Sequence, residues 1–194
     1  MLINGDCLEV MKDIPDGSVD MILTDPPYGT TACKWDSIIP LEPMWEQLKR
    51  IIKPNGAIVM TASQPFTTTL IASNMKMFKY CWVWEKTRAT GHVHAKNKPM
   101  KSHEDIVVFS KGVTIHKGQS KKRMNYNPQG LIDCDITIKQ STASDVVMGS
   151  RSGRNSTFKQ NKTGYPKSVL KFSSISKNAH PTQKPVALME YLIK

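Results

Sequence analysis

The chain has 194 residues, and its 27 Lys and Arg against 16 Asp and Glu give a net charge of +11. Hydrophobic residues make up 39% of the chain, which is enough for a packed core and excludes wholesale disorder. No apolar run reaches the length of a membrane span, and no basic segment followed by an apolar stretch opens the sequence. We therefore expect neither a membrane span nor a signal peptide.

The four cysteines, Cys7, Cys33, Cys81 and Cys134, are far apart and form no C-x-x-C pair. This spacing disfavours a zinc knuckle and a disulfide framework, so we expect a reduced, cytoplasmic protein. The excess positive charge points to a polyanionic partner, most often nucleic acid. A basic but otherwise ordinary enzyme is the alternative that net charge leaves open.

Apolar runs alternate with helical spacings along most of the chain. The runs predict buried strands at 19–24, 57–60, 78–84 and 105–109. A short amphipathic stretch lies at 7–12. The spacings predict three helices, at 41–52, from 63–65 to about 75, and from 185 onward. Residues 53–56 are typical of a helix stop and would end the first of these helices. Strands that alternate with helices imply an α/β sheet with helices on both faces.

The pattern fails between Lys111 and Tyr165, where ten Lys and Arg stand against three Asp and give a net charge of +7. We read the chain as a catalytic α/β part at 1–111, a basic inserted lobe at 112–165 and a return to the catalytic part at 166–194. The candidate nucleic-acid contacts are Lys117, Lys121, Lys122, Arg123, Arg151 and Arg154. Phosphate binding suits this composition, and a solvated charge run is the alternative for Lys121–Arg123.

The first predicted strand ends abruptly at Asp25-Pro26-Pro27-Tyr28, because proline cannot donate to a sheet ladder. In open α/β sheets the chemistry gathers outside the carboxyl ends of strands. An aspartate, a proline carbonyl that no local amide needs and an aromatic ring would suit a flat ring that carries an amino group. The segment is therefore the candidate active site.

Asp-Pro-Pro-Tyr after an apolar strand resembles the catalytic motif of DNA amino-methyltransferases, which methylate adenine N6 or cytosine N4. Four further segments, at 4–7, 48–56, 98–111 and 180–185, resemble motifs of the same family in the expected order. With the catalytic motif first, the basic region next and His-Pro-Thr-Gln-Lys-Pro last, this order is similar to the permuted β arrangement of the family. The resemblance covers nearly the whole chain and is weakest in the basic region.

The resemblance implies a Rossmann-like sheet, S-adenosylmethionine as the cofactor and double-stranded DNA as the partner, with the basic region as the target-recognition lobe. It implies methyl transfer to a base that is flipped out of the duplex, without a metal. The residues that it assigns to catalysis are Asp25, Pro26, Pro27 and Tyr28. Asp25 and the Pro26 carbonyl would accept the two amino hydrogens, and Tyr28 would stack on the base.

The resemblance also assigns residues to the cofactor. These are Asp6, Cys7, Asp25, His180, Thr182, Gln183 and Lys184. Asp6 and Cys7 would contact the cofactor adenine, and the segment with Lys184 would line the methionine end, where a lysine suits the carboxylate. Two simpler roles remain open: Asp6 as the cap of the following helix, and Lys184 as a solvated surface charge.

One expected element is missing from the sequence. In the permuted arrangement a Gly-rich cofactor loop and a second acidic residue follow the His-Pro-Thr-Gln-Lys-Pro segment and its helix, whereas the sequence stops at Lys194. Gly149 and Gly153 form the nearest glycine pair, but they lie in the basic region. We therefore expect a sheet that is incomplete at its C-terminus. Truncation is the favoured explanation; a second polypeptide and an inactive DNA-binding remnant are the alternatives.

Several finer questions stay open at this level. An Asp at the first motif position favours adenine N6, with cytosine N4 as the alternative and RNA as an alternative substrate. A metal site at His92, His94, His103 and Glu104 is disfavoured because no third ligand has a defined position. A homodimer, a cognate restriction endonuclease, and a bacterial or phage origin are compatible with the sequence.

Overall fold

The computed structural model describes residues 2–114, 120–139, 157–175, 180 and 182–194. These fall into two compact units, Met1–Tyr126 with Ser168–Lys194, and Asn127–Lys167. The helices are α1 (Cys7–Val10), α2 (Leu41–Ile51), α3 (Phe66–Ser73) and α4 (Val186–Ile193), with 3-10 turns η1 (Met11–Asp13), η2 (His92–His94) and η3 (Ser120–Lys122). The strands are β1 (Val19–Thr24), β2 (Ile52–Ala62), β3 (Phe78–Thr90), β4 (Lys101–Ser110), β5 (Ile132–Lys139), β6 (Thr157–Thr163) and β7 (Val169–Lys171).

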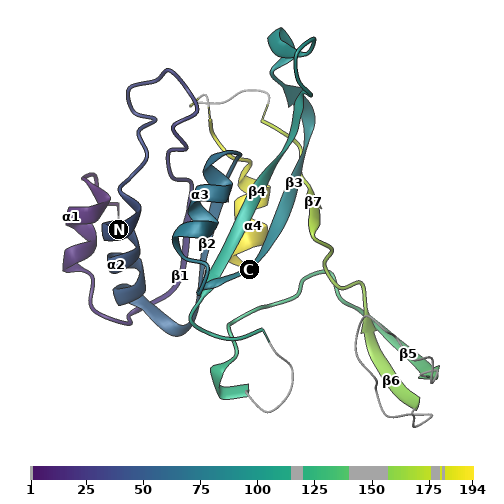
Figure 1. The fold of residues 1–194 in the computed structure, drawn as a ribbon. Coiled ribbons are helices and arrows are strands. Elements are labelled where there is room, and N and C mark those ends of the chain that lie inside the picture. Colours follow the sequence, from purple (N-terminus) through teal and green to yellow (C-terminus); the bar gives the residue numbers. More distant parts are fainter. Residues whose placement is uncertain (1, 115–119, 140–156, 176–179, 181) are drawn as a thin grey trace. The chain divides into compact units, whose positions relative to one another are not determined.

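The first unit is built on a mixed sheet with the strand order β1-β2-β4-β3-β7 (Figure 1). β1 is parallel to β2, and β7 is parallel to β3, whereas β4 runs antiparallel to both of its neighbours. β3 and β4 are longer than the apolar runs that predicted them. Their polar halves pair with each other, so the ladder continues past the residues that the core buries.

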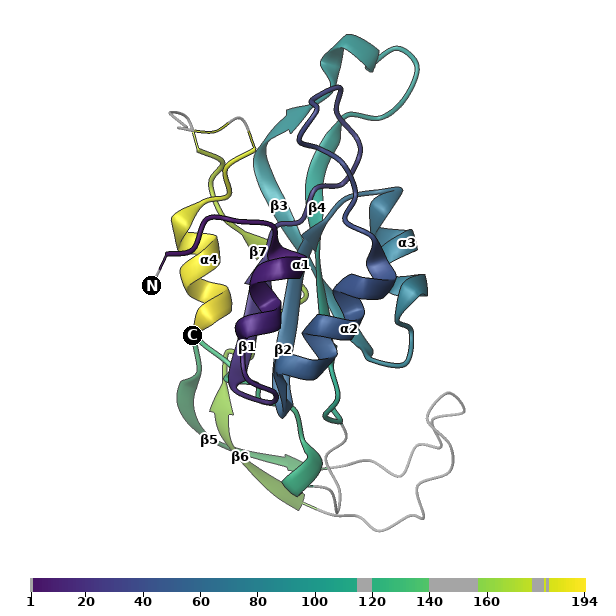
Figure 2. The same ribbon diagram turned by 90° about the vertical axis from the view of Figure 1, so that its left-hand side faces the viewer.

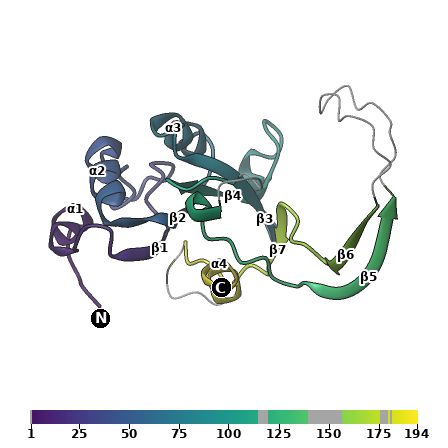
Figure 3. The ribbon, with the colours of Figure 1, turned by 90° about the horizontal axis from the view of Figure 1, so that it is seen from below.

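Helices cover both faces of this sheet, as expected (Figures 2 and 3). On one face, Trp45 and Leu48 of α2 pack with α3 against alternate residues of β2 and β4. On the other face, Leu188 and Leu192 of α4 pack with Val59 and the other set of alternate residues. Successive side chains of β2 and β4 thus point alternately into two apolar cores, one on each face of the sheet. Both faces need apolar residues, which explains why both strands read as continuous apolar runs.

The segment 53–56 was expected to end a helix and proves to be part of a strand. α2 ends at Ile51, and β2 begins at once with Ile52 opposite Val19. The register then shifts, so that Ala57 is opposite Met21. A Cβ on Gly56 would lie 2.7 Å from the Asp20 carbonyl oxygen, so this irregular pairing requires glycine.

The second unit contains the antiparallel pair β5–β6, in which Lys162 pairs with Asp133 and Lys159 with Asp135. The expected lobe began at 112, whereas the compact unit begins at Asn127. The difference arises because Met124 is buried in the second core of the sheet, 4% exposed, which ties the preceding residues to the first unit. Within the described residues, no helix is long and apolar enough to cross a membrane.

Candidate active site

Asp25 lies where three strand ends meet at one edge of the sheet. Thr24, the last residue of β1, is opposite Met60 of β2, so Asp25 comes beside Thr61. Asp25 Oδ1 accepts hydrogen bonds from Thr61 Oγ1 at 2.5 Å and from the Tyr28 hydroxyl at 2.8 Å. Because β4 is antiparallel, its first residues reach the same edge and bring Glu104 there. The expected position of the motif at a strand's carboxyl end is therefore confirmed.

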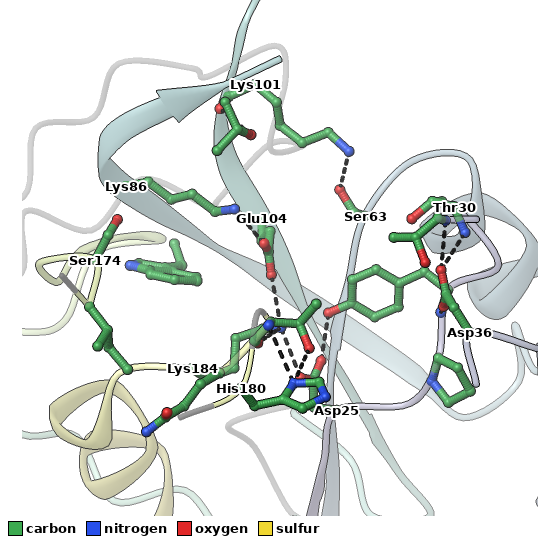
Figure 4. Close-up of a pocket in the computed structure, with 18 of the residues that line it drawn as sticks. Asp25, Thr30, Asp36, Ser63, Lys86, Lys101, Glu104, Ser174, His180 and Lys184 are labelled. Carbon is green, nitrogen blue, oxygen red and sulfur yellow. Dashed lines mark hydrogen bonds and ion pairs between the residues drawn. The ribbon is translucent and has the colours of Figure 1, made fainter. Parts of the chain in front are cut away.

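Lys184 reaches Asp25 from the segment that precedes α4 (Figure 4). Its Nζ lies 2.8 Å from Asp25 Oδ2 and 3.4 Å from Glu104 Oε2, and it lies 5.4 Å from the centre of the Tyr28 ring. The Lys184 side chain is only 7% exposed. The simpler interpretation of Lys184 as a solvated surface charge is therefore wrong, because two carboxylates and an aromatic face hold this ammonium inside the site.

Glu104 extends this charge network away from Asp25. Its Oε1 forms an ion pair with Lys86, and both side chains are 13% exposed. Its Oε2 is buried and, among the described residues, accepts no hydrogen bond, since the contact to Lys184 is an ion pair without hydrogen-bond geometry. A buried carboxylate oxygen in this state can accept a hydrogen bond from a ligand.

Tyr28 is held as a neutral hydrogen-bond donor. Its ring stacks on Phe66 with the centroids 5.5 Å apart, and burial, followed by the nearby negative charge of Asp25, raises its pKa well above the ordinary value for a tyrosine. The hydroxyl therefore keeps its proton and donates a hydrogen bond to Asp25 Oδ1.

The loop after Tyr28 is fastened by Asp36, which sequence reasoning did not identify. Asp36 accepts backbone hydrogen bonds from Tyr28 and Gly29 on Oδ1 and from Thr30 and Thr31 on Oδ2, at 2.7–2.9 Å. Burial alone would raise the pKa of this carboxyl, but the hydrogen bonds outweigh it and lower the pKa to about 2. Asp36 thereby fixes the backbone that carries Tyr28.

These residues open into a cavity of about 700 Å³. Its lining comprises Asp25, Pro26, Pro27, Tyr28, Thr30, Thr31, Trp35, Asp36, Ser63, Trp84, Lys86, Arg88, Thr90, Lys101, Glu104, Ser174, Ile175, His180, Thr182, Gln183 and Lys184. The cavity combines carboxylates, cations and aromatic rings, and its size is in the range of cofactor and ligand sites. It can bind a polar, partly aromatic molecule and present a carboxylate to an amine.

The structure brings most of the predicted cofactor residues to this cavity. His180, Thr182 and Gln183 line it; the His180 ring packs on Trp35, and Thr182 Oγ1 lies 3.0 Å from His180 Nδ1. Asp6 and Cys7 lie apart, at the start of α1, and do not line it. The Leu8 amide donates to Asp6 Oδ1 at 2.8 Å, so Asp6 does cap that helix.

The predicted nucleic-acid residues lie outside this cavity or outside the described residues. Lys121 and Lys122 lie on η3, and they and Arg123 are exposed. Lys117, Arg151 and Arg154 fall outside the described residues. The described residues hold no cluster of three or more side chains that could bind a metal ion.

Sequence reasoning missed four site residues or gave them another role: Thr61, Asp36, Glu104 and Lys86. The signal for Thr61 was present, because two consecutive parallel strands end at the same edge and Thr61 lies at the end of the second run. Glu104 and Lys86 gave no such signal. They reach the edge only because β3 and β4 form an antiparallel ribbon there.

Comparisons with known proteins identify the family of the chain. A family model described as DNA methylase matches residues 19–194. The type II methyltransferase M.HpaI of Haemophilus parainfluenzae is 25% identical over 210 residues, which cover 99% of this chain and 58% of that protein. M.BglII of Bacillus subtilis is 42% identical over 64 residues, which cover 29% of this chain and 18% of that protein. The chain thus spans less than two thirds of the length of these relatives.

Solved structures show the fold. The M1.HpyAVI–SAM complex superposes with a TM-score of 0.54 at 18% identity, over 98% of this chain and 74% of that one. The PvuII DNA methyltransferase, which is cytosine-N4-specific, gives 0.59 at 14% identity, over 97% of this chain and 67% of that one. Both support the expected Rossmann-like sheet. Since the family model covers nearly the whole chain, this protein belongs to the DNA methylase family of N6 and N4 amino-methyltransferases.

Proposed function

We propose that this chain carries the catalytic site of a DNA methyltransferase that transfers a methyl group to the exocyclic amino group of a flipped base. The favoured target is N6 of adenine. The observation that carries the proposal is Asp25, a carboxylate at the end of β1 that is held by Thr61 and Tyr28 and lines the cavity. The choice of adenine rests on the Asp at the first motif position. The family of the chain supports the reaction class.

The exocyclic amine of a nucleobase is a poor nucleophile, because its lone pair is delocalised into the ring. Asp25 Oδ2 and the Pro26 carbonyl would accept its two hydrogens, which localises the lone pair and aims it along one direction. Thr61 and Tyr28 keep Asp25 Oδ1 occupied, so Oδ2 is the oxygen that turns toward the substrate. Tyr28 would supply an aromatic face for the base.

Lys184 takes the place of that substrate amine in this structure, since its ammonium donates to Asp25 Oδ2. A base that enters must therefore take over this hydrogen bond. The Glu104 carboxylate already lies 3.4 Å from the same ammonium, so it still balances the positive charge when Lys184 leaves Asp25. In this proposal Lys184 occupies Asp25 Oδ2 until the base binds.

S-adenosylmethionine fits the residues that line the cavity. The methionine end of this cofactor carries an ammonium and a carboxylate; Glu104 Oε2 is a buried acceptor without a hydrogen bond among the described residues, and His180, Thr182 and Gln183 offer polar groups nearby. When bound, the cofactor supplies an activated methyl group on a sulfonium. Asp6 and Cys7 remain the proposed contacts of its adenine.

A transfer assay tests the proposal. An intact enzyme that contains this chain is incubated with duplex DNA and S-adenosylmethionine that carries a labelled methyl group, and digestion to nucleosides distinguishes N6-methyladenine from N4-methylcytosine. We expect Asp25→Ala to lower the transfer rate by about 10²–10⁴-fold. Asp20→Ala changes an exposed aspartate of β1, the strand that precedes Asp25, and should retain the wild-type rate. Equal rates in the Asp25→Ala variant and the wild type would refute the role of Asp25.

A further inference from the structure

The β3–β4 ribbon continues past the rest of the sheet (Figures 1 and 2). The ladder between β4 and β2 ends at Asp105, and the ladder between β3 and β7 ends at Glu85. Beyond these points, within the described residues, the two strands pair only with each other. The turn η2 lies at the tip, where Gly91 adopts a φ of 88°.

The projecting ribbon has a strongly one-sided charge. From Lys86 to His103 it carries five Lys and Arg and three His, with no Asp or Glu. Only Lys86 forms an ion pair with an acidic side chain of the described residues, and every residue from 87 to 103 is exposed. The ribbon buries few side chains here, so its cations are available to solvent or to a polyanion.

The base of the ribbon is part of the cavity. Lys86, Arg88, Thr90 and Lys101 line it, and Lys101 Nζ donates to Ser63 Oγ at 2.7 Å. A polyanion that follows the ribbon from its tip would therefore arrive at Asp25. The ribbon therefore offers cations for the role that the basic region at 112–165 was expected to fill, and its base lines the cavity that contains Asp25.

We propose that the β3–β4 ribbon, residues 86–103, binds duplex DNA next to the flipped base, with Arg88, Lys96 and Lys98 on the phosphates. This proposal rests on the proposed function, from which it takes duplex DNA as the partner. A two-stranded β-ribbon has a width that the major groove of B-form DNA admits. Phosphates dominate the affinity of such contacts, because each cation that neutralises one releases a condensed counterion.

The test is the salt dependence of binding to a short mixed-sequence DNA duplex, measured by fluorescence anisotropy over a series of NaCl concentrations. The variant Lys96→Gln/Lys98→Gln removes two exposed charges at the tip, away from the cavity lining. We expect its affinity to fall by roughly tenfold, and the slope of log affinity against log salt to become shallower by about 0.9 for each lysine that contacts a phosphate. The charge reversal Lys96→Glu/Lys98→Glu should weaken binding further.

The matched control is Lys49→Gln/Lys76→Gln, which removes the same charge from exposed lysines near the opposite ends of the strands, just before β2 and β3 begin. It should keep the wild-type slope. Equal slopes in the tip variant and in this control, with a wild type that binds DNA, would overturn the ribbon proposal and leave the proposed function standing. A folded wild type that binds no duplex at any salt concentration would overturn both. Circular dichroism confirms that each variant is folded.

Discussion

Lys184 and Asp25 are 159 residues apart in the sequence, yet Lys184 Nζ lies 2.8 Å from Asp25 Oδ2. This contact joins the segment before α4 to the end of β1, so the Asp25–Tyr28 segment and the last motif of the chain lie in one site. The ammonium also lies 3.4 Å from Glu104 Oε2, which makes it the shared cation of two carboxylates. We therefore expect both the stability and the chemistry of the site to depend on this residue.

Lys184→Met keeps the length of the side chain and removes its charge. We expect the free energy of unfolding to fall by about 1–3 kcal/mol, because Asp25 and Glu104 are left without their common cation; the value is less than for a fully buried pair since Asp25 is 31% exposed. Urea unfolding measures this change. The double variant Lys184→Met/Glu104→Gln should recover part of the loss, because it removes one of the two stranded charges.

A surface ion pair provides the control for this prediction. Lys171 pairs with Glu85 at 3.2 Å, but its side chain is 78% exposed. Lys171→Met should therefore change the unfolding free energy by less than about 1 kcal/mol. If both lysine variants have the same stability, the ammonium of Lys184 is not engaged in the site as described.

Tyr28 has two proposed functions, and two substitutions separate them. Tyr28→Phe removes the hydroxyl that donates to Asp25 but keeps the ring on Phe66, and Thr61 still holds Asp25 Oδ1. We expect a loss of methyl transfer of less than about tenfold for Tyr28→Phe and of about 10²-fold or more for Tyr28→Ala, which also removes the proposed stacking face. Equal losses in the two variants would show that the hydroxyl, not the ring, carries the effect.

Asp36 should make the loop after Tyr28 sensitive to acid. Its pKa is about 2 in the folded chain, below the ordinary value of 3.8, so folding stabilises the ionised form. The stabilisation, about 2–3 kcal/mol, is complete above about pH 4 and is lost as the pH falls from there through about 2. The measurement is urea unfolding of the wild type and of Asp36→Asn at several pH values.

The difference in stability between these two proteins isolates Asp36 from the other carboxylates. It should be largest near neutral pH and shrink as the pH falls through about 2, because Asp36 then becomes protonated in the wild type too. Asp20→Asn, which removes an exposed aspartate, should differ little from the wild type at any pH. A difference for Asp36→Asn that does not depend on pH would contradict the assigned hydrogen bonds.

Helix α4 holds the segment with Lys184 against the sheet. Leu188 is fully buried in the second core, whereas Val186 on the same helix is 64% exposed. We expect Leu188→Ala to lower the free energy of unfolding by about 2–5 kcal/mol, and Val186→Ala to leave it nearly unchanged. Thermal or urea unfolding compares the two. A similar, small effect of both changes would mean that α4 is not packed on the sheet.

The apolar runs of the sequence were enough to predict the central strands and the helices on both faces. β1 has the predicted bounds, and α2 ends one residue before the predicted end, because these elements bury apolar side chains whose spacing records their period. The ends of β3 and β4 were not predicted. Their outer residues are exposed and polar, and they form strands only because each supplies the other with backbone partners.

By itself, the sequence determined where the candidate catalytic motif lies. Two prolines after Asp25 must end a strand, and strand ends in such sheets carry the chemistry. Only the tertiary structure decided which groups surround that carboxylate. Thr61, Glu104 and Lys184 come from three separate elements, and hydrogen bonds and ion pairs between distant residues leave no periodic trace in a sequence. The burial of Lys184 was likewise decided by packing. The residues next to it in the sequence do not show whether this lysine is exposed on the surface or buried in a site.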